Sequence, residues 1–254
     1  MAPHRKGVAL TEPSPRGRGE QPAVIHGRNA VLEAARAGRV ARLYQADGLG
    51  HDPRLDELAT LVRVEIVPAE RIDAIVSGVH QGVAAELKPR REWSLRDLLA
   101  TEPSLLVALD SIMDPQNLGA IIRSAEVAGA DGAIVPEHRS APLSPAAVKA
   151  SSGASELMPI ARVSGMPSAV AEVKRSGIWC AALDVRGDTW PWDFDLTQRV
   201  CVVVGGEGQG VHRLVLERCD VRLRLPVKGR IGSFNASAAA AALLYEITRQ
   251  RSLH

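Results

Sequence analysis

The stretch Leu225-Pro-Val-Lys-Gly-Arg-Ile-Gly-Ser-Phe-Asn-Ala-Ser237 decides the fold, because it joins the last apolar strand of the chain to an alanine-rich helix that ends near Arg251. Its proline and glycines bend the backbone and leave N–H and C=O groups free. Its serine and asparagine side chains can cap the helix that follows. The stretch therefore predicts either an ordinary strand-to-helix turn or a loop that grips a small polar ligand through backbone atoms.

Strands and helices alternate over residues 104–254. The runs Leu105–Leu109 and Arg199–Val204 are apolar without alternation, which is typical of strands buried on both faces of a parallel sheet. The order predicts an α/β fold with a doubly wound sheet, whose ligands bind beyond the carboxyl ends of the strands. Polar loops follow Leu109, Val204 and Leu225 at such ends, so we expect the three loops to meet.

The first 103 residues predict three further segments. Residues 22–90 read as a small α/β domain, with helices expected at Arg28–Ala37, Pro53–Leu61 and Ala69–Val76 and strands at Val40–Gln45, Val62–Val67 and Gly82–Leu87. Residues 91–103 read as a linker with one short helix capped by Ser94. Residues 1–21 are basic and rich in Pro and Gly, which favours a disordered tail over an arm that contacts RNA.

Composition limits the classes of function. The 254 residues carry a net charge of +2, so any basic surface must be local, and 3% aromatic residues disfavour binding through many stacked bases. No apolar run is long enough to span a membrane, Met1 to Gln21 contains no apolar stretch of the kind a leader needs, and no Cys or His has metal-binding spacing. Three cysteines without a CxxC motif favour free thiols in a reducing compartment. We therefore expect a cytoplasmic protein without a metal.

The glycine run Gly205–Gly210 does not match a dinucleotide-binding loop. Its spacing is Gly-x-Gly-x-Gly, it lies near the end of the chain, and Glu207 would repel a pyrophosphate. No lysine of a phosphate-binding loop accompanies it. A loop that carries a carboxylate suits a cationic or hydroxyl-bearing ligand better.

Three segments together resemble the ordered motifs of the SpoU family, the RNA 2′-O-ribose methyltransferases of the knotted SPOUT class. They are Asn117-Leu-Gly-Ala-Ile-Ile-Arg123, Gly205-Gly-Glu-Gly-Gln-Gly210 and the stretch from Leu225 to Ser237. His26-Gly-Arg-Asn-Ala-Val-Leu-Glu33 and His80-Gln-Gly-Val83 resemble the RNA substrate-binding domain of the RlmB branch. That branch methylates a guanosine in the peptidyl-transferase loop of 23S ribosomal RNA, whereas the TrmH branch, which acts on tRNA, lacks such a domain.

The resemblance implies a trefoil knot in residues 104–254, an obligate homodimer whose sites use both chains, and S-adenosylmethionine (SAM) as the cofactor. It places SAM against Gly205, Gly206, Leu225, Ser233 and Phe234. The family usually has leucine where Phe234 stands, which alters the expected adenine pocket. A tRNA or antibiotic-resistance rRNA methyltransferase, and a knotted RNA-binding protein without catalysis, are the alternatives.

A ribose hydroxyl is a poor nucleophile, so catalysis must align it with the methyl donor and stabilise the charge that develops on its oxygen. The resemblance assigns this task to five residues: Asn117, Arg123, Glu207, Ser233 and Asn235. A guanidinium is never deprotonated in proteins, so we expect Arg123 to bind a phosphate rather than to act as a base. The alternatives are helix caps at the two asparagines, a surface ion pair at Arg123 and a solvated charge at Glu207.

The candidate RNA-binding residues fall into two groups. His26, Arg28, His80 and Gln81 lie in the two N-terminal motifs, beside glycines at element boundaries, and Lys228 and Arg230 lie in the stretch before the last helix. Cationic side chains and imidazoles at such places can contact RNA phosphates. Local turns at the two histidines and a solvated pair at Lys228 and Arg230 are equally compatible with the sequence.

Overall fold

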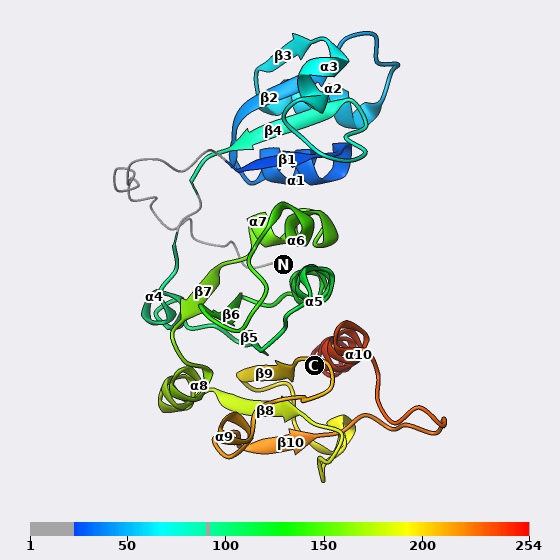
Figure 1. Cartoon of the computed structure of the whole chain (residues 1–254). Coiled ribbons are helices and arrows are strands. Elements are labelled where there is room, and N and C mark those ends of the chain that lie inside the picture. Colours follow the sequence, from blue (N-terminus) through cyan, green and yellow to red (C-terminus); the bar gives the residue numbers. More distant parts are fainter. Residues whose placement is uncertain (1–22, 90–91, 254) are drawn as a thin grey trace.

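The structure, a computed structural model, describes residues 23–89 and 92–253, which form two β-sheets with their own helices (Figure 1). The predicted tail, residues 1–21, lies outside the described residues. In the view of Figure 1 the smaller sheet lies above the larger one, and α1 of the smaller unit faces α6 and α7 of the larger unit.

The N-terminal unit is a four-stranded sheet in the order β1-β4-β2-β3, in which only β2 and β3 pair in parallel. Its elements are β1 (Val24–His26), α1 (Arg28–Arg36), β2 (Val40–Ala46), α2 (Pro53–Leu61), β3 (Val64–Val67), α3 (Ala69–Asp73) and β4 (Val83–Leu87). The helix predicted at Pro53–Leu61 has the predicted bounds, because Asp52 caps it and Pro53 fixes its first turn. The edge strand β1 was not predicted.

The C-terminal unit is a six-stranded, wholly parallel sheet in the order β10-β8-β9-β5-β6-β7, so the predicted doubly wound parallel sheet is confirmed. Its elements, with the short helix α4 that precedes them, are α4 (Leu95–Leu99), β5 (Leu105–Asp110), α5 (Pro115–Val127), β6 (Gly132–Pro136), α6 (Pro145–Ala150), α7 (Ala154–Leu157), β7 (Ile160–Val163), α8 (Met166–Arg175), β8 (Trp179–Leu183), the 3-10 turn η1 (Pro191–Asp193), β9 (Val200–Gly205), α9 (Arg213–Leu216), β10 (Val221–Leu223) and α10 (Ala236–Arg251).

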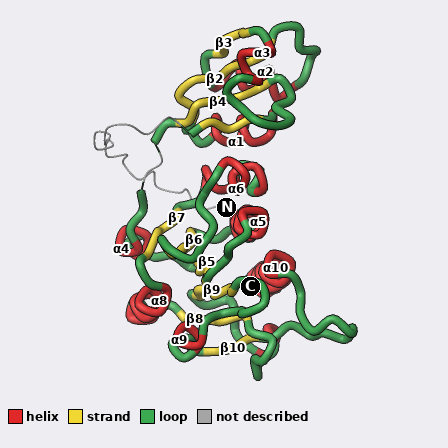
Figure 2. The backbone as a smooth tube through the Cα atoms, in the orientation of Figure 1, coloured by secondary structure: helices red, strands yellow, loops and turns green. Residues whose placement is uncertain are grey.

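Strand β5 shows why these strands read as continuous apolar runs. All of its residues are buried: Leu105, Val107 and Leu109 face the core cluster that contains α5 and α10, and Leu106 and Ala108 face the cluster that contains α4, α8 and α9. Helices thus cover both faces of the sheet (Figure 2). The chain returns from the edge strand β10 to pack α10 on α5, which brings Asn235, at the end of the last loop, beside Asn117 and Glu207.

The two units are joined by a packed contact as well as by the chain. Val148 of α6 is buried in the core of the N-terminal unit. Arg39 forms an ion pair with Glu156 of α7, with 2.7 Å between Nε and Oε2, and the Glu156 side chain is only 1% exposed. At Gly153 (φ 90°), a Cβ would lie 2.4 Å from Cβ of Glu33, so the chain passes too close for any other residue. We call this contact the domain seam.

Arg39→Ala should lower the free energy of unfolding by about 2–3 kcal/mol, because it takes the cationic partner from a buried carboxylate. Urea unfolding followed by circular dichroism measures this. The control is Arg36→Ala, since Arg36 pairs with Glu33 and Glu57 at an exposed position and should change the midpoint little. Equal midpoints for the two variants would contradict a stabilising role of the seam.

Candidate active site

Three side chains from loops far apart in the sequence meet beyond the carboxyl ends of the parallel strands. Asn117 Nδ2 donates to Glu207 Oε1 at 2.9 Å, and Asn235 Nδ2 lies 2.5 Å from the same oxygen and 3.0 Å from Asn117 Oδ1. We call these residues the amide–carboxylate cluster. The expected meeting of the three loops is therefore a feature of the fold.

The two asparagines differ in their local roles. Asp114, not Asn117, caps α5, because Pro115 occupies the first helical position and leaves Asn117 in the first turn. The alternative that Asn117 is only a cap is therefore wrong; its side chain is buried within the cluster. Asn235 does cap α10, its Oδ1 accepting from Ser237 N at 2.9 Å, while its amide nitrogen serves the cluster. Asn235 therefore caps α10 with its side-chain oxygen and joins the cluster with its side-chain nitrogen.

The glycine loop after β9 is held against the end of β5. Buried Asp110 accepts from the His212 backbone N–H at 2.7 Å, and its Oδ2 lies 3.1 Å from His212 Nδ1. The Asp110 carbonyl also accepts from Gly206 N at 3.0 Å. A Cβ on Gly206 would lie 2.2 Å from the carbonyl oxygen of Ser111, which itself has a φ of 62°. The sequence does not mark Asp110 and His212 as site residues, because they lie 102 residues apart and share no motif.

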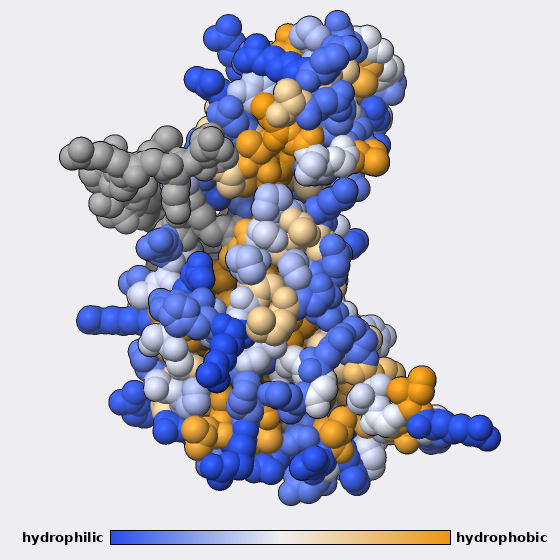
Figure 3. Space-filling model, in the orientation of Figure 1, coloured by the Kyte–Doolittle hydropathy of each residue, from blue (hydrophilic) through white to orange (hydrophobic). Residues whose placement is uncertain are grey.

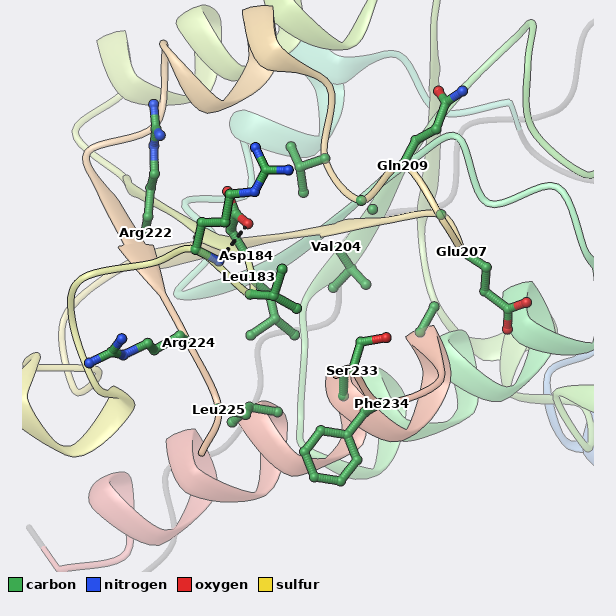
Figure 4. Close-up of a pocket in the computed structure, with 18 of the residues that line it drawn as sticks. Leu183, Asp184, Val204, Glu207, Gln209, Arg222, Arg224, Leu225, Ser233 and Phe234 are labelled. Carbon is green, nitrogen blue, oxygen red and sulfur yellow. Dashed lines mark hydrogen bonds between the residues drawn. The ribbon is translucent and has the colours of Figure 1, made fainter. Parts of the chain in front are cut away.

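A cavity of about 690 Å³ opens beside the cluster (Figure 4). All five residues that the sequence suggested for a cofactor line it: Gly205, Gly206, Leu225, Ser233 and Phe234. Val204 and Leu183 add apolar surface at the strand ends, and Glu207 lies at one side of the opening in Figure 4. Phe234 is 51% exposed, so its ring forms a rim and not a closed wall. Backbone groups and apolar side chains thus make most of this site.

Arg123 does not join the cluster within the chain. It is exposed on α5 and lines a separate cleft of about 430 Å³ at the domain seam, together with Asn29, Arg54 and Ser152. Glu207 binds the two asparagines, and no contact between Glu207 and Arg123 occurs among the described residues. The alternative of a surface ion pair also finds no support among the described residues.

The fold brings the two N-terminal motifs together. Arg28 donates from its backbone N and from Nε to the side chain and the backbone of Gln81, both at 3.1 Å. His80 accepts from Gly82 N through Nδ1, so its Nε2 carries the proton that faces Asp73 at 3.0 Å. Burial, and then the nearby Lys149, lower the pKa of His26, which is therefore neutral at pH 7.

Arg28 has a second partner in this unit. It forms an ion pair with Asp52, which also binds Arg54. Hydrogen bonds from Arg54, above all, hold the pKa of Asp52 well below its usual range. Asp52 is therefore ionised at neutral pH, where it pairs with both guanidinium groups.

The remaining candidates lie in the segment between β10 and α10, which projects from the body of the protein (Figure 1). Lys228 and Arg230 are exposed there, and no hydrogen bond or ion pair fixes them among the described residues. In Figure 3 the projecting segment shows both hydrophilic and hydrophobic atoms. The structure leaves both side chains free to meet a partner.

The structure also bears on thiol, metal and membrane sites. Cys180 and Cys201 are buried as expected, and burial raises the pKa of Cys219 to about 12. Within residues 23–89 and 92–253, no group of three His, Cys, Asp or Glu side chains could hold a metal ion. No helix in the described part of the chain has both the length and the apolar character of a membrane span.

Known proteins share both units of this chain. Residues 104–245 match the model of the SpoU rRNA Methylase family, and residues 24–93 match the RNA 2′-O ribose methyltransferase substrate-binding model. The 23S rRNA (guanosine-2′-O-)-methyltransferase RlmB of Pseudomonas syringae pathovar tomato is 39% identical over 240 residues, which cover 90% of this chain and 96% of that relative. An uncharacterized tRNA/rRNA methyltransferase of Mycobacterium ulcerans is 40% identical over 93% of this chain and 80% of the relative.

Solved structures agree with this assignment. The SpoU methyltransferase AviRb from Streptomyces viridochromogenes superimposes with a TM-score of 0.78 at 28% identity, over 91% of this chain and 90% of that one. An AdoMet-bound rRNA methyltransferase from Sinorhizobium meliloti gives a TM-score of 0.73 at 26% identity, over 89% and 87% of the two chains. The chain therefore belongs to the SpoU rRNA methylase family and is an RNA 2′-O-methyltransferase with the substrate-binding domain of that family.

Proposed function

We propose that the protein transfers a methyl group from SAM to the ribose 2′-hydroxyl of a guanosine in the peptidyl-transferase loop of 23S rRNA. The observation that carries the proposal is the amide–carboxylate cluster of Asn117, Glu207 and Asn235 at the mouth of the 690 Å³ cavity. A relative that covers 90% of this chain is named a 23S rRNA (guanosine-2′-O-)-methyltransferase, which supports the proposed RNA and nucleotide but does not name the loop.

The cavity fits the proposed cofactor. When bound, SAM supplies a methyl group that is already a strong electrophile. Apolar Val204, Leu183 and Leu225 suit an adenine ring, and the backbone of Gly205 and Gly206 offers N–H and C=O groups to its polar edges. The exposed ring of Phe234 leaves the rim open on one side, which predicts a cofactor that exchanges readily.

Polar side chains of the site position the acceptor hydroxyl and stabilise the charge that develops on its oxygen. Asn117 and Asn235 fix the carboxylate of Glu207, which can then accept a hydrogen bond from a ribose hydroxyl at a defined place. The hydroxyl of Ser233 faces the same cavity and can donate to an oxygen that gains charge. Arg123 binds the phosphate next to the acceptor bidentately, and a phosphate oxygen or a water molecule takes the proton.

Arg123 can reach such a site only if it belongs to the other subunit. It lies on α5 in the seam cleft, apart from the cluster of its own chain. We therefore include a homodimer in the proposal, with Arg123 of one protomer completing the site of its partner. A trefoil knot formed by the passage from β10 to α10 belongs to the same proposal, as does a cytoplasmic location, which the free buried thiols favour.

The substrate-binding unit favours ribosomal RNA over tRNA. A TrmH/SpoU tRNA modifying enzyme from A. aeolicus aligns with only 63% of this chain but with 83% of its own length, at a TM-score of 0.54. The N-terminal unit would supply further RNA contacts through His26, Arg28, His80 and Gln81. In the C-terminal unit, Lys228 and Arg230 would do the same.

Incubation of the purified protein with tritiated SAM and RNA tests the proposal. We expect label in 23S rRNA, at a ribose that becomes resistant to alkaline cleavage. Transcripts of 16S rRNA and tRNA in parallel reactions separate the alternative substrates, and mapping with and without the protein locates the nucleotide. Label on a base would refute ribose methylation. RNA binding without heat of SAM binding in calorimetry would indicate a non-catalytic RNA-binding protein that has lost SAM affinity.

Asn235→Ser and Asn235→Ala separate the two roles of this residue. Serine caps helices about as well as asparagine, so Asn235→Ser should keep the stability of the protein, whereas Asn235→Ala should lose about 1 kcal/mol. Both variants lack the amide that fixes Glu207, and both should lower turnover on the order of 10²-fold. Thermal melting and single-turnover methylation measure the two effects. Full turnover of Asn235→Ser would mean that the cap alone matters.

A further inference from the structure

Two of the four tryptophans of the chain stack on each other in the loop between β8 and β9. The rings of Trp190 and Trp192 are 5.4 Å apart between centroids and 7° from parallel. Trp190 lines the 690 Å³ cavity, whereas Trp192 does not line it and is 53% exposed. An aromatic ring with an open flank in a chain so poor in aromatic residues is a feature that the amide–carboxylate cluster does not explain.

The pair is held in place. Arg224 of the following segment lies over the Trp190 ring, with its guanidinium carbon 4.1 Å from the centroid, and its Nε is buried without a hydrogen-bond partner. The backbone of Thr189 exchanges hydrogen bonds with Arg222 and Arg224 of the β10 edge. On the other side, Gln250 of α10 donates to the Pro191 carbonyl at 3.0 Å. The two rings are therefore presented by a fixed loop, which reduces the entropy lost on binding.

The residues near the Trp190–Trp192 pair are mostly cationic. Arg186, Arg222 and Arg224 line the same cavity, and none of the three forms an ion pair among the described residues. Figure 4 shows Arg222 and Arg224 on the side away from Glu207. Asp184 lies nearby, and its Oδ1 accepts from the Arg186 backbone N at 2.9 Å. Guanidinium groups beside a stacked aromatic pair are what single-stranded nucleic acids need, since bases stack on the rings and phosphates meet the cations.

We propose that the Trp190–Trp192 pair and these three arginines bind one unpaired base of the RNA, next to the nucleotide that enters the active site. This inference rests on the proposed function and adds a site outside the substrate-binding unit. The base stacks on Trp192, and its phosphates lie toward the arginines. Because Trp192, unlike Trp190 and the arginines, lies outside the cofactor cavity, its removal changes RNA affinity and not SAM affinity.

Fluorescence anisotropy with labelled oligoadenylate, and with the same strand carrying abasic positions, tests this site without requiring catalysis. Trp192→Ala should weaken oligoadenylate binding roughly tenfold and change abasic-strand binding little. Trp192→Phe should restore most of the loss, and SAM affinity by calorimetry should stay at the wild-type value. Trp179→Ala is the matched control, because Trp179 is 45% exposed at the opposite end of β8 and packs edge-on against Phe194.

Three outcomes would overturn the inference. In the first, Trp192→Ala binds each of the two strands as tightly as the wild type does. In the second, the variant loses SAM affinity and keeps its RNA affinity. In the third, the variant sediments as a monomer where the wild type sediments as a dimer. The last outcome would mean that a second copy of the chain covers the tryptophans. Failure of the wild type to methylate rRNA would contradict the proposed function alone, because the binding assay does not depend on turnover.

Discussion

Arg123→Ala should lower the rate of methyl transfer on the order of 10²–10³-fold, while SAM binds as it does to the wild type. The guanidinium has no partner within its own chain among the described residues, and it does not line the 690 Å³ cavity, so its removal leaves the cofactor site intact. Arg123→Lys should recover little, because an ammonium cannot hold a phosphate bidentately. Single-turnover kinetics and calorimetry with SAM measure the two effects.

Arg175→Ala is the matched control, since Arg175 is an exposed arginine at the end of α8, on the other face of the sheet. It should leave the rate unchanged. Wild-type turnover of Arg123→Ala would remove Arg123 from the mechanism. A parallel loss of SAM affinity would place it in the cofactor site of a partner instead.

Mixing two inactive variants tests whether Arg123 serves the partner's site. A heterodimer of Arg123→Ala and Asn235→Ala chains has one site with both wild-type residues if the site is shared between protomers, and none if it is not. A statistical mixture should then recover about a quarter of the wild-type rate. Separate preparations of the two variants should remain inactive. If mixing restores no activity, either Arg123 and Asn235 act in the site of the same chain or Arg123 has no part in the reaction.

Gly205→Ala should abolish most cofactor binding, because the glycine loop cannot keep its shape. A Cβ at this position would lie 2.0 Å from the carbonyl carbon of Gly210 and 2.1 Å from the nitrogen of Val211. Both are backbone atoms of the same loop, so the loop itself must move. Forcing such a shift costs about 1–3 kcal/mol, which corresponds to roughly ten- to a hundredfold in SAM affinity if the bound loop bears it.

Calorimetry with SAM and thermal melting distinguish a local from a global effect of Gly205→Ala. Gly50→Ala is the control, since nothing lies within 4 Å of a Cβ at Gly50 and its backbone needs no left-handed conformation. We expect the control to behave like the wild type. Normal SAM affinity of Gly205→Ala would mean that the glycine loop does not form the cofactor site.

The parallel sheet could be predicted because its strands carry their own signal. Leu105–Leu109 and Arg199–Val204 are apolar at every position but the first of the second run, and only a strand covered on both faces needs that composition. Two of the short strands could not be predicted. β1 has three residues and β7 has four, of which Arg162 is exposed, so neither is long enough to show a period. Their pairing with neighbouring strands makes them strands.

At the start of α5, two residues could each cap the helix, and their residue types alone do not decide between them. Asn117 and Asp114 are both good capping residues three positions apart. Pro115 decides between them, because it is favoured at the first helical position and its predecessor takes the extended conformation of a cap. The Asn117 side chain is then available to Glu207, which lies 90 residues further along the chain.

The sequence by itself determined the parallel α/β domain, the three polar loops at its strand ends and the family, since each is written in a local run of residue types. Only the tertiary structure decided that Arg123 lies in the seam cleft and not beside Glu207, that Asp110 and His212 hold the glycine loop, and that Arg224 covers Trp190. These contacts join residues from 34 to more than 100 positions apart. Which of them form depends on how the helices pack on the sheet, and no local pattern records that packing.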